Sequence, residues 1–292
     1  MRTPNFFIVG APRCGTTALF SYLKAHPDIA MSAYKEPHYF GTDLVGLQFE
    51  LFRGKHEQYL GLFNHAKNER MVGEASVYYL FSQQAAAEIH AFDPSAKIII
   101  MLRSPIEVLE SIYDQIQFTG DMAFPSFTAM WEQAHIYKND PAAESRKRFL
   151  SGEGVLFSEQ VARYLTYFPA EQVHVIVYDD FKQCVAQAYQ STLEFLGVDT
   201  QFQPEFKAIN ARQKARSPFL QGLLSNQWLV HLGSRVTWLA LPIYRSLKVI
   251  NSTPMQKTII PTDLANTLKA EFRPDVEALS VLLQRDLMHW VV

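Results

Sequence analysis

Short runs of consecutive apolar residues recur along the chain, and segments with helical spacing of apolar and polar positions separate them. The runs are Phe6–Val9, Lys97–Leu102 and Val173–Tyr178. Few polar side chains interrupt them, which is typical of strands that are buried on both faces of a parallel sheet. We therefore predict that these runs form parallel strands at the centre of an α/β fold.

The intervening segments carry helix signals. Ser104 and Pro105 suit an N-cap and a first helical position. The predicted helices cover residues 15–25, which end before His26-Pro27, residues 105 to about 118, residues 158–168, and a segment after Tyr178 to about Leu196. Strands separated by such helices form βαβ units with right-handed crossovers. Ligands bind such sheets at the carboxyl ends of the strands, where Gly10, Arg103 and Tyr178 all fall.

Residues 219–250 differ from the rest of the chain. They combine leucines with Trp228, Trp238 and Tyr244, include scattered cations, and show no strand alternation. This composition fits helical packing, a lid or helical insertion over an acceptor pocket, or a surface that contacts lipid, and packing or a lid is the favoured interpretation. Because no internal repeat or low-complexity linker divides the sequence, we predict one domain over residues 1–292.

Composition limits the partners and the compartment. The 292 residues are 48% hydrophobic and 19% charged, with a net charge of −2, which argues against nucleic acid as a partner. The two cysteines cannot form a disulfide framework, which fits a reducing compartment. Arg2 precedes the first strand directly, and Val236–Tyr244 is too short to span a bilayer. We expect a cytoplasmic protein without a transmembrane segment.

The segment 5–17 has the form of a phosphate-binding loop between a strand and a helix. The spacing of Gly10, Gly15 and Thr17 is that of G-x-x-x-x-G-K-[ST], but Thr16 occupies the lysine position and the cation lies at Arg13. Backbone N–H groups at the helix N-terminus can still bind an anion. The loop therefore predicts binding of a phosphorylated nucleotide without hydrolysis of a γ-phosphate.

Two further segments contain candidate binding or catalytic residues. Arg103-Ser104-Pro105 is followed by Ser111 on the predicted helix, so the hydroxyl and the guanidinium could hold one phosphate. Lys35-Glu36-Pro37-His38-Tyr39-Phe40 places a cation, a carboxylate and an imidazole in a turn after the first helix.

These motifs resemble those of the bacterial PAPS-dependent sulfotransferases, which move a sulfuryl group from 3′-phosphoadenosine 5′-phosphosulfate (PAPS) to a hydroxyl or amine. The resemblance implies a P-loop NTPase-like three-layer fold, with a central parallel sheet flanked by helices. It implies contacts to the 5′-phosphosulfate from Arg13, Cys14, Gly15, Thr16 and Thr17, and contacts to the 3′-phosphate from Arg103 and Ser111. It extends to Gly73-Glu74-Ala75-Ser76, Tyr178-Asp179-Asp180, Phe195-Leu196-Gly197 and Arg285-Asp286-Leu287 with Trp290.

The run Lys35–Phe40 is similar to a segment of the heparan-type branch, in which the glutamate is the catalytic base. The resemblance implies that Glu36 is the base and His38 a supporting or alternative one. From the residues alone, a solvated acid paired with Lys35 is the favoured interpretation of Glu36, and only the resemblance favours the base. Arg13 replaces the lysine of many relatives and can act only electrostatically, because arginine stays charged.

Other cations and Tyr178 have less definite roles. In the family a basic loop closes over the 3′-phosphate, which implies that role for Arg212, Lys214 and Arg216, although these residues could also form an exposed turn. Tyr178 could stack near the adenine or belong to the core. We interpret Arg146-Lys147-Arg148 as a solvated helix face.

The resemblance therefore implies a PAPS-dependent sulfotransferase that releases PAP, and we expect it to act on a small, hydrophobic or carrier-tethered alcohol, with a saccharide or lipid also open. The predicted acceptor pocket comprises Lys35, Tyr39, Phe40, Ser76 and Tyr79, with help from the aromatic region after Phe219. The scattered histidines suggest no essential metal. Two alternatives are a P-loop nucleotide kinase and a catalytically silent PAP- or PAPS-binding module.

Overall fold

The computed structural model describes residues 2–46, 52–120, 122–207, 213–215, 252–254 and 258–292. A five-stranded, entirely parallel sheet forms the centre, in the order β2-β3-β1-β4-β5. Its strands are β1 (Phe6–Gly10), β2 (Ile29–Met31), β3 (Met71–Ala75), β4 (Lys97–Leu102) and β5 (Val173–Val177). A separate antiparallel pair joins β6 (Gln213–Ala215) to β7 (Ser252–Pro254).

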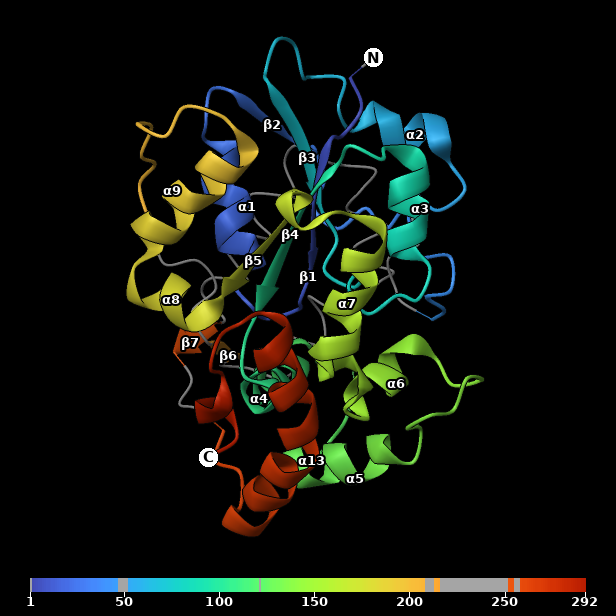
Figure 1. The fold of residues 1–292 in the computed structure, drawn as a ribbon. Helices are drawn as coiled ribbons and strands as arrows, with labels where there is room; N and C mark the ends of the chain where they lie inside the picture. Colours follow the sequence, from blue (N-terminus) through green and yellow to red (C-terminus); the bar gives the residue numbers. More distant parts are fainter. Residues whose placement is uncertain (1, 47–51, 121, 208–212, 216–251, 255–257) are drawn as a thin grey trace.

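Helices surround the sheet. They are α1 (Thr16–Lys24), α2 (His56–Gly61), α3 (Ala85–Phe92), α4 (Pro105–Thr119), α5 (Phe127–His135), α6 (Ser145–Leu150), α7 (Phe157–Tyr167), α8 (Tyr178–Gln183), α9 (Val185–Leu196) and α13 (Thr262–Leu282), with short 3₁₀ helices η1 (Glu153–Val155), η2 (Ala170–Gln172) and η3 (Met288–Trp290). In Figure 1, α1, α8 and α9 lie on one side of the sheet and α2, α3 and α7 on the other. The predicted α/β class with a central parallel sheet is therefore confirmed.

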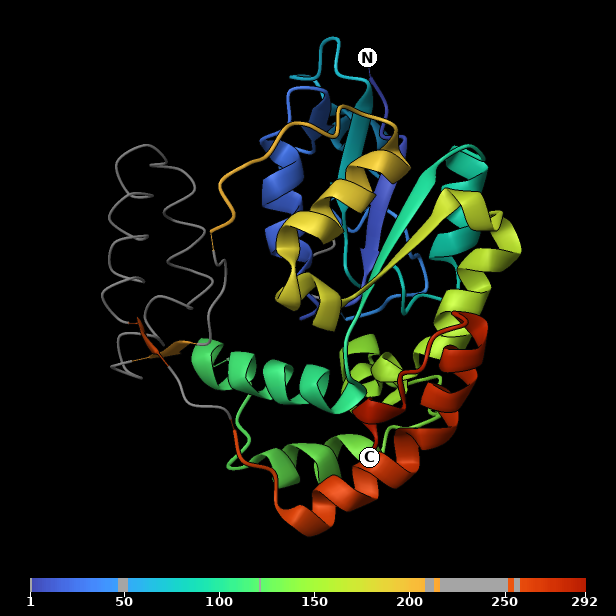
Figure 2. The same ribbon diagram turned by 60° about the vertical axis from the view of Figure 1, so that its left-hand side comes forward.

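The carboxyl ends of the strands point toward a second group of helices. The view in Figure 2 shows α4, α5 and α13 crossing below the end of β4, with α4 beginning directly beyond it. The strand order places β1 between β3 and β4, so the chain leaves β1 toward β2 on one side and later continues to β4 and β5 on the other. The loop after β1 thus lies at the topological switch point, where such sheets bind ligands.

The apolar runs explain the central strands. Residues of β1 are completely buried, and Ile98 through Leu102 of β4 are as well. Full burial on both faces is what a continuous apolar run favours. After β4 the chain continues into α4, which begins at Pro105 after Ser104 and is followed by Gly120 in the left-handed conformation.

The predicted elements agree with the structure in most places. β4 has the predicted bounds, β1 extends one residue further to Gly10, and α7 and α4 lie within one residue of the predicted ranges. β5 ends at Val177, so the prediction that Tyr178 belongs to the strand is wrong, because this residue already opens α8. The helix expected up to Leu196 is divided into α8 and α9 at Cys184, and β2 and β3 were not predicted.

Two predictions involve residues 219–250. Residues 219–250 lie outside the described residues, so their role as a lid, insertion or lipid contact stays a prediction, as does the single domain over 1–292. Within the described ranges, no helix is both long and apolar enough to cross a membrane.

Candidate active site

The loop after β1 forms one wall of the candidate site. The amide of Ala11 donates to the carbonyl of Met101 on β4 at 2.7 Å, which ties the loop to the neighbouring strand. Gly15 lies in the left-handed region at φ 92° immediately before α1. A Cβ on Gly15 would lie 3.2–3.3 Å from the side chains of Met101, Phe181 and Tyr178. Both the backbone conformation and the close packing therefore favour glycine at the point where α1 presents its first N–H groups.

The loop cation contacts the second predicted phosphate element. Arg13 has φ 65°, a left-handed conformation that is uncommon for a residue with a side chain. Its Nε donates to Ser111 Oγ at 2.9 Å, and Ser111 is buried on α4. Arg103 Nη1 approaches the carbonyl oxygen of Arg13 at 3.4 Å. Arg13, Ser111 and Arg103, which lie up to 98 positions apart in sequence, thus come together at the ends of β1 and β4.

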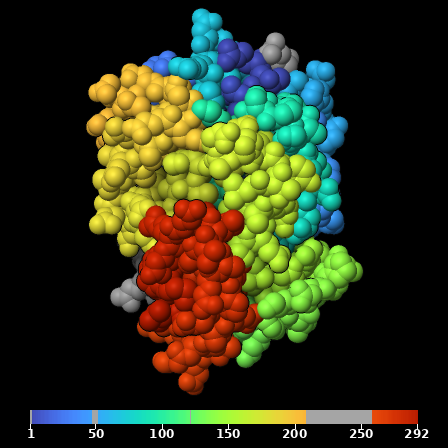
Figure 3. Space-filling model, viewed as in Figure 1, coloured from blue at the N-terminus to red at the C-terminus, as the bar shows by residue number. Residues whose placement is uncertain are grey.

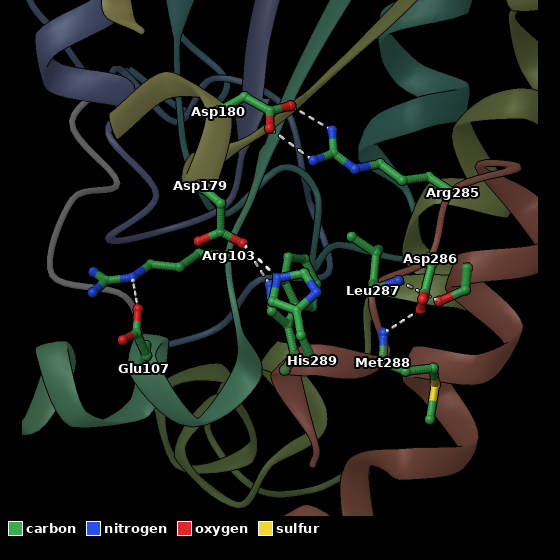
Figure 4. A network of polar contacts seen from close by, with 11 residues as sticks. Arg103, Glu107, Asp179, Asp180, Arg285, Asp286, Leu287, Met288 and His289 are labelled. Carbon is green, nitrogen blue, oxygen red and sulfur yellow. Dashed lines mark hydrogen bonds and ion pairs between the residues drawn. The ribbon is translucent and has the colours of Figure 1, made fainter. Parts of the chain in front are cut away.

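Arg103 also has two other partners. Its Nε donates to Glu107 Oε2 at 2.8 Å, as Figure 4 shows, and its guanidinium carbon lies 4.6 Å from the centre of the Tyr178 ring. The ring therefore supports the cation through a cation–π contact. In this structure Tyr178 contacts Arg103, and adenine stacking stays a prediction.

Cys14 lies on the buried side of the loop. Its Sγ approaches the carbonyl oxygen of Pro12 at 3.4 Å, and the side chain has no exposed surface. Burial raises the pKa of the Cys14 thiol to about 12, although the charges of Arg103 and Arg13 act in the opposite direction. The residue is therefore a neutral thiol at neutral pH, and only its backbone is available to an anion.

The Lys35–Phe40 loop lies beyond the end of β2. The amide of Glu36 donates to the carbonyl of Ala75 at 2.8 Å, which fixes the loop beside β3. Glu36 and His38 both adopt positive φ, 62° and 48°. Such conformations cost energy in residues with side chains and tend to occur at functional sites.

Three charged or polar side chains of this loop form one cluster. Lys35 Nζ lies 2.5 Å from Glu36 Oε1, and His38 Nε2 lies 3.3 Å from Glu36 Oε2. Burial by itself would raise the pKa of Glu36, but the hydrogen bond from His38 and the charge of Lys35 outweigh it and lower the pKa to about 2. Glu36 is therefore a carboxylate at neutral pH.

A buried polar network holds the Lys35–Phe40 loop on the side that faces the core. Glu74 on β3 has no exposed surface and accepts a hydrogen bond from Tyr59 Oη at 2.6 Å. Ser76 Oγ accepts from the amide of His38, and Tyr79 Oη accepts from the amide of Phe40, both at 3.1 Å. Burial raises the pKa of Glu74 to about 7, although the nearby hydroxyls of Tyr59, Ser76 and Tyr79 counteract it.

This arrangement differs from part of the predicted acceptor pocket. Ser76, Tyr79 and Phe40 are almost completely buried, because their polar groups and rings hold the loop from the core side. Tyr39 stacks on Tyr59 with ring centres 4.1 Å apart, and its hydroxyl lies 3.0 Å from His56 Nδ1. Of the five predicted acceptor residues, Lys35 and Tyr39 are therefore the partly exposed ones.

Tyr78 was not predicted. Its ring lies 5.9 Å from that of His38, between centres. Burial and the charge of Glu36 raise the pKa of Tyr78 to about 12, and the charges of Arg146 and Arg13 act against them. The hydroxyl therefore lies within electrostatic range of both the loop cation and Glu36. Arg146 is thus one of the charges that act on Tyr78, and the interpretation of Arg146-Lys147-Arg148 as a solvated helix face stays a prediction.

Some predicted contacts cannot be placed. Arg212 and Arg216 lie outside the described residues, and for Lys214 the structure describes only the backbone, in β6. β6 packs beside α4, the helix that carries Ser111. In the part of the chain that the structure describes, no three His, Cys, Asp or Glu side chains are grouped closely enough to hold a metal ion.

Comparison with known proteins adds independent findings. A model of the sulfotransferase domain matches residues 3–221. Carbohydrate sulfotransferase 15 of Mus musculus is 26% identical over 245 residues, which cover 67% of this chain and 44% of the relative. Heparan sulfate glucosamine 3-O-sulfotransferase 6 of Mus musculus is 28% identical over 169 residues, with 58% of this chain and 44% of the relative covered. The chain thus spans less than half the length of these curated relatives.

A solved structure is similar over nearly the whole chain. The sulfotransferase from Alicyclobacillus acidocaldarius superposes with a TM-score of 0.76 at 29% identity, and 99% of each chain is covered. This similarity includes the central sheet and its flanking helices, and it confirms the predicted fold class.

Proposed function

This chain belongs to the sulfotransferase domain family, and from that premise we propose that it transfers a sulfuryl group from PAPS to an acceptor hydroxyl. The observation that carries the proposal is the meeting of two guanidinium groups and a carboxylate loop at one edge of the sheet. Arg13 and Arg103 converge at the ends of β1 and β4, and the ionised Glu36 lies in the loop beside β3.

The donor would bind through the loop after β1. The N–H groups that open α1 and the guanidinium of Arg13 would hold the 5′-phosphosulfate, since both favour an anion there. Arg103 and Ser111 would hold the 3′-phosphate. Because Ser111 already contacts Arg13, one hydroxyl would connect the two phosphate subsites.

In the reaction, the acceptor oxygen attacks sulfur while the bond between sulfur and the phosphate oxygen breaks. Glu36 accepts the proton of the acceptor hydroxyl, and PAP leaves with the negative charge on its phosphate. Arg13 and the N-terminus of α1 stabilise that developing charge. Arginine cannot give up a proton at neutral pH, so its contribution is electrostatic.

Lys35 has a place in this scheme. In the structure its ammonium group is paired with Glu36, which makes the carboxylate a weak base. An incoming sulfuryl group would compete for the ammonium group, and Glu36 would become more basic as Lys35 moved toward the sulfate. His38, buried against the other carboxylate oxygen, would orient Glu36 or share the proton.

The names of the relatives support one class of acceptor. Their names describe sulfation of carbohydrate and of heparan sulfate glucosamine. A sugar hydroxyl is therefore the first acceptor to screen, ahead of the hydrophobic alcohol that the aromatic content of residues 219–250 suggested. Mass spectrometry of acceptor mixtures incubated with PAPS would detect the addition of one sulfuryl group.

The decisive test of the mechanism is Glu36→Gln. We expect this variant to bind PAP nearly as well as the unmodified chain but to turn over at least ~10²-fold more slowly. Glu171→Gln, an exposed acid at the amino end of β5, is the matched control and should leave turnover unchanged. Normal turnover by Glu36→Gln would remove Glu36 from the mechanism. Phosphoryl transfer from ATP that requires a divalent metal would instead favour the kinase alternative.

A further inference from the structure

The C-terminal segment returns to the sheet close to the candidate nucleotide site. Figure 3 shows the red C-terminal residues packed directly below the yellow residues of α8 and beside the yellow-green residues of α7. Figure 4 shows Asp179 and Asp180, in the first turn of α8, pointing toward this segment. Neither aspartate has a role in the proposed reaction, although both directly follow Tyr178.

Both aspartates bind the segment through their side chains. Asp180 accepts from both terminal nitrogens of Arg285, with Nη2 at 2.8 Å from Oδ1. Asp179 Oδ2 accepts from Trp290 Nε1 at 2.8 Å and lies 3.0 Å from His289 Nε2. We call residues 285–290 the C-terminal clamp.

The clamp itself is anchored firmly. Leu287 and Trp290 are buried, and the amide of Leu287 donates to Ser280 Oγ on α13 at 3.1 Å. Asp180 and Arg285 are largely exposed, so that ion pair by itself is weak. The bond between Asp179 and the buried indole is the stronger restraint, because losing it would leave a buried N–H without a partner.

The contacts between the clamp and α8 lie next to Tyr178, which contacts Arg103 of the proposed 3′-phosphate site. α8 has only six residues, and so short a helix depends on tertiary contacts for its stability. Its first residue, Tyr178, packs under the guanidinium of Arg103, while the next two residues are held by the clamp. The clamp thus holds the two residues that directly follow Tyr178, whose ring contacts Arg103.

We propose that the C-terminal clamp positions Tyr178, and through it Arg103, for the 3′-phosphate of the donor nucleotide. Asp179 and Trp290 are the positioning residues in this inference, which rests on the proposed function because it requires a phosphorylated nucleotide at Arg103. Loosening the clamp lets the ring and the guanidinium move together, so binding of the nucleotide weakens while the sulfuryl-transfer step is unaffected.

The test uses the full chain and PAP as the probe, with calorimetry at a temperature well below the unfolding transition of each variant. Asp179→Ala and Trp290→Phe should each weaken PAP binding about three- to tenfold, the range that corresponds to one lost hydrogen bond. They should raise KM for PAPS and leave kcat at saturating PAPS unchanged. Asp286→Ala is the matched control, because this exposed clamp residue contacts the amide of Met288 and not α8.

A double-mutant cycle separates positioning from general stability. In an Arg103→Ala background, Asp179→Ala should cause no further loss of PAP affinity, because the clamp acts through Arg103. Unchanged PAP affinity in both clamp variants, with only the melting temperature lowered, would overturn the inference and leave the proposed function intact. An unmodified chain that does not bind PAP would refute the proposed function, and the inference with it.

Discussion

Replacing Glu74 by glutamine should change how the stability of the protein depends on pH. Glu74 is completely buried on β3, and its Oε2 atom accepts a hydrogen bond from the hydroxyl of Tyr59 at 2.6 Å. Its Oε1 atom is buried without a hydrogen-bond partner. Ionising such a group is unfavourable, because a buried charge loses its hydration. Glutamine keeps the shape and the acceptor oxygen but cannot ionise.

The magnitude follows from the pKa. Burial raises the pKa of Glu74 from 4.5 to about 7, so the folded protein retains a proton that the unfolded chain releases above pH 4.5. The stability that protonated Glu74 contributes is fully present below pH 4.5 and is lost as the pH rises through about 7. At about 1.4 kcal/mol for each pKa unit, the total loss is about 3 kcal/mol.

Urea unfolding of the unmodified chain and of Glu74→Gln, from about pH 5 to about pH 8.5, measures this effect. The free energy of unfolding of the unmodified chain should fall by about 2 to 3 kcal/mol relative to that of the variant across this range. Glu171→Gln, at an exposed site, should show no such trend. If the difference between the unmodified chain and Glu74→Gln is the same at every pH, Glu74 is ionised throughout and the argument from burial is wrong.

Three further outcomes can be measured directly. Iodoacetamide at about pH 8 should modify the exposed Cys184 and spare Cys14, whose pKa burial raises to about 12, and peptide mass mapping showing equal labelling would contradict this. Gly10→Ala should lower the free energy of unfolding by about 1–3 kcal/mol, because its Cβ would lie 2.5 Å from Leu80 Cβ; unchanged urea unfolding would show that the loop relaxes. Arg103→Ala should weaken PAP binding by about 1.5–3 kcal/mol by calorimetry, and an unaltered affinity would place the 3′-phosphate elsewhere.

The strands that could be predicted are those whose burial is evident from a local run of apolar residues. β4 has the predicted bounds because Ile98 through Leu102 are apolar and buried on both faces. β2 and β3 were missed for a physical reason. β2 has only three residues, and β3 contains Gly73 and Glu74, which are unfavourable in strands by local preference. Glu74 is accommodated there because Tyr59, 15 positions away, supplies a hydroxyl.

The contact of Arg13 with Ser111 follows from a rule that can be applied to the sequence. Both segments follow strands, and the carboxyl ends of neighbouring parallel strands lie at one edge of a sheet. The same rule cannot predict which of Tyr78 and Tyr79 is buried and which lies beside His38. Both follow β3 in a turn, where the alternation of a strand no longer assigns side chains to faces, and only the structure shows that Tyr79 is fully buried while Tyr78 is partly exposed beside His38.

The sequence also left open whether Glu36 is a base or a solvated acid paired with Lys35. The pairing is present, but a solvated acid would not need the surroundings that Glu36 has. Both Glu36 and His38 adopt positive φ, and the imidazole is buried against the carboxylate. Each of these features costs energy that a surface ion pair of this kind could not offset. The amides of Glu36, His38 and Phe40 nevertheless donate to Ala75, Ser76 and Tyr79, respectively. The core therefore maintains this loop in a conformation that its own residues disfavour. Such a conformation is expected where a carboxylate must keep a fixed position beside the loop that carries Arg13, and this favours the base over the solvated acid.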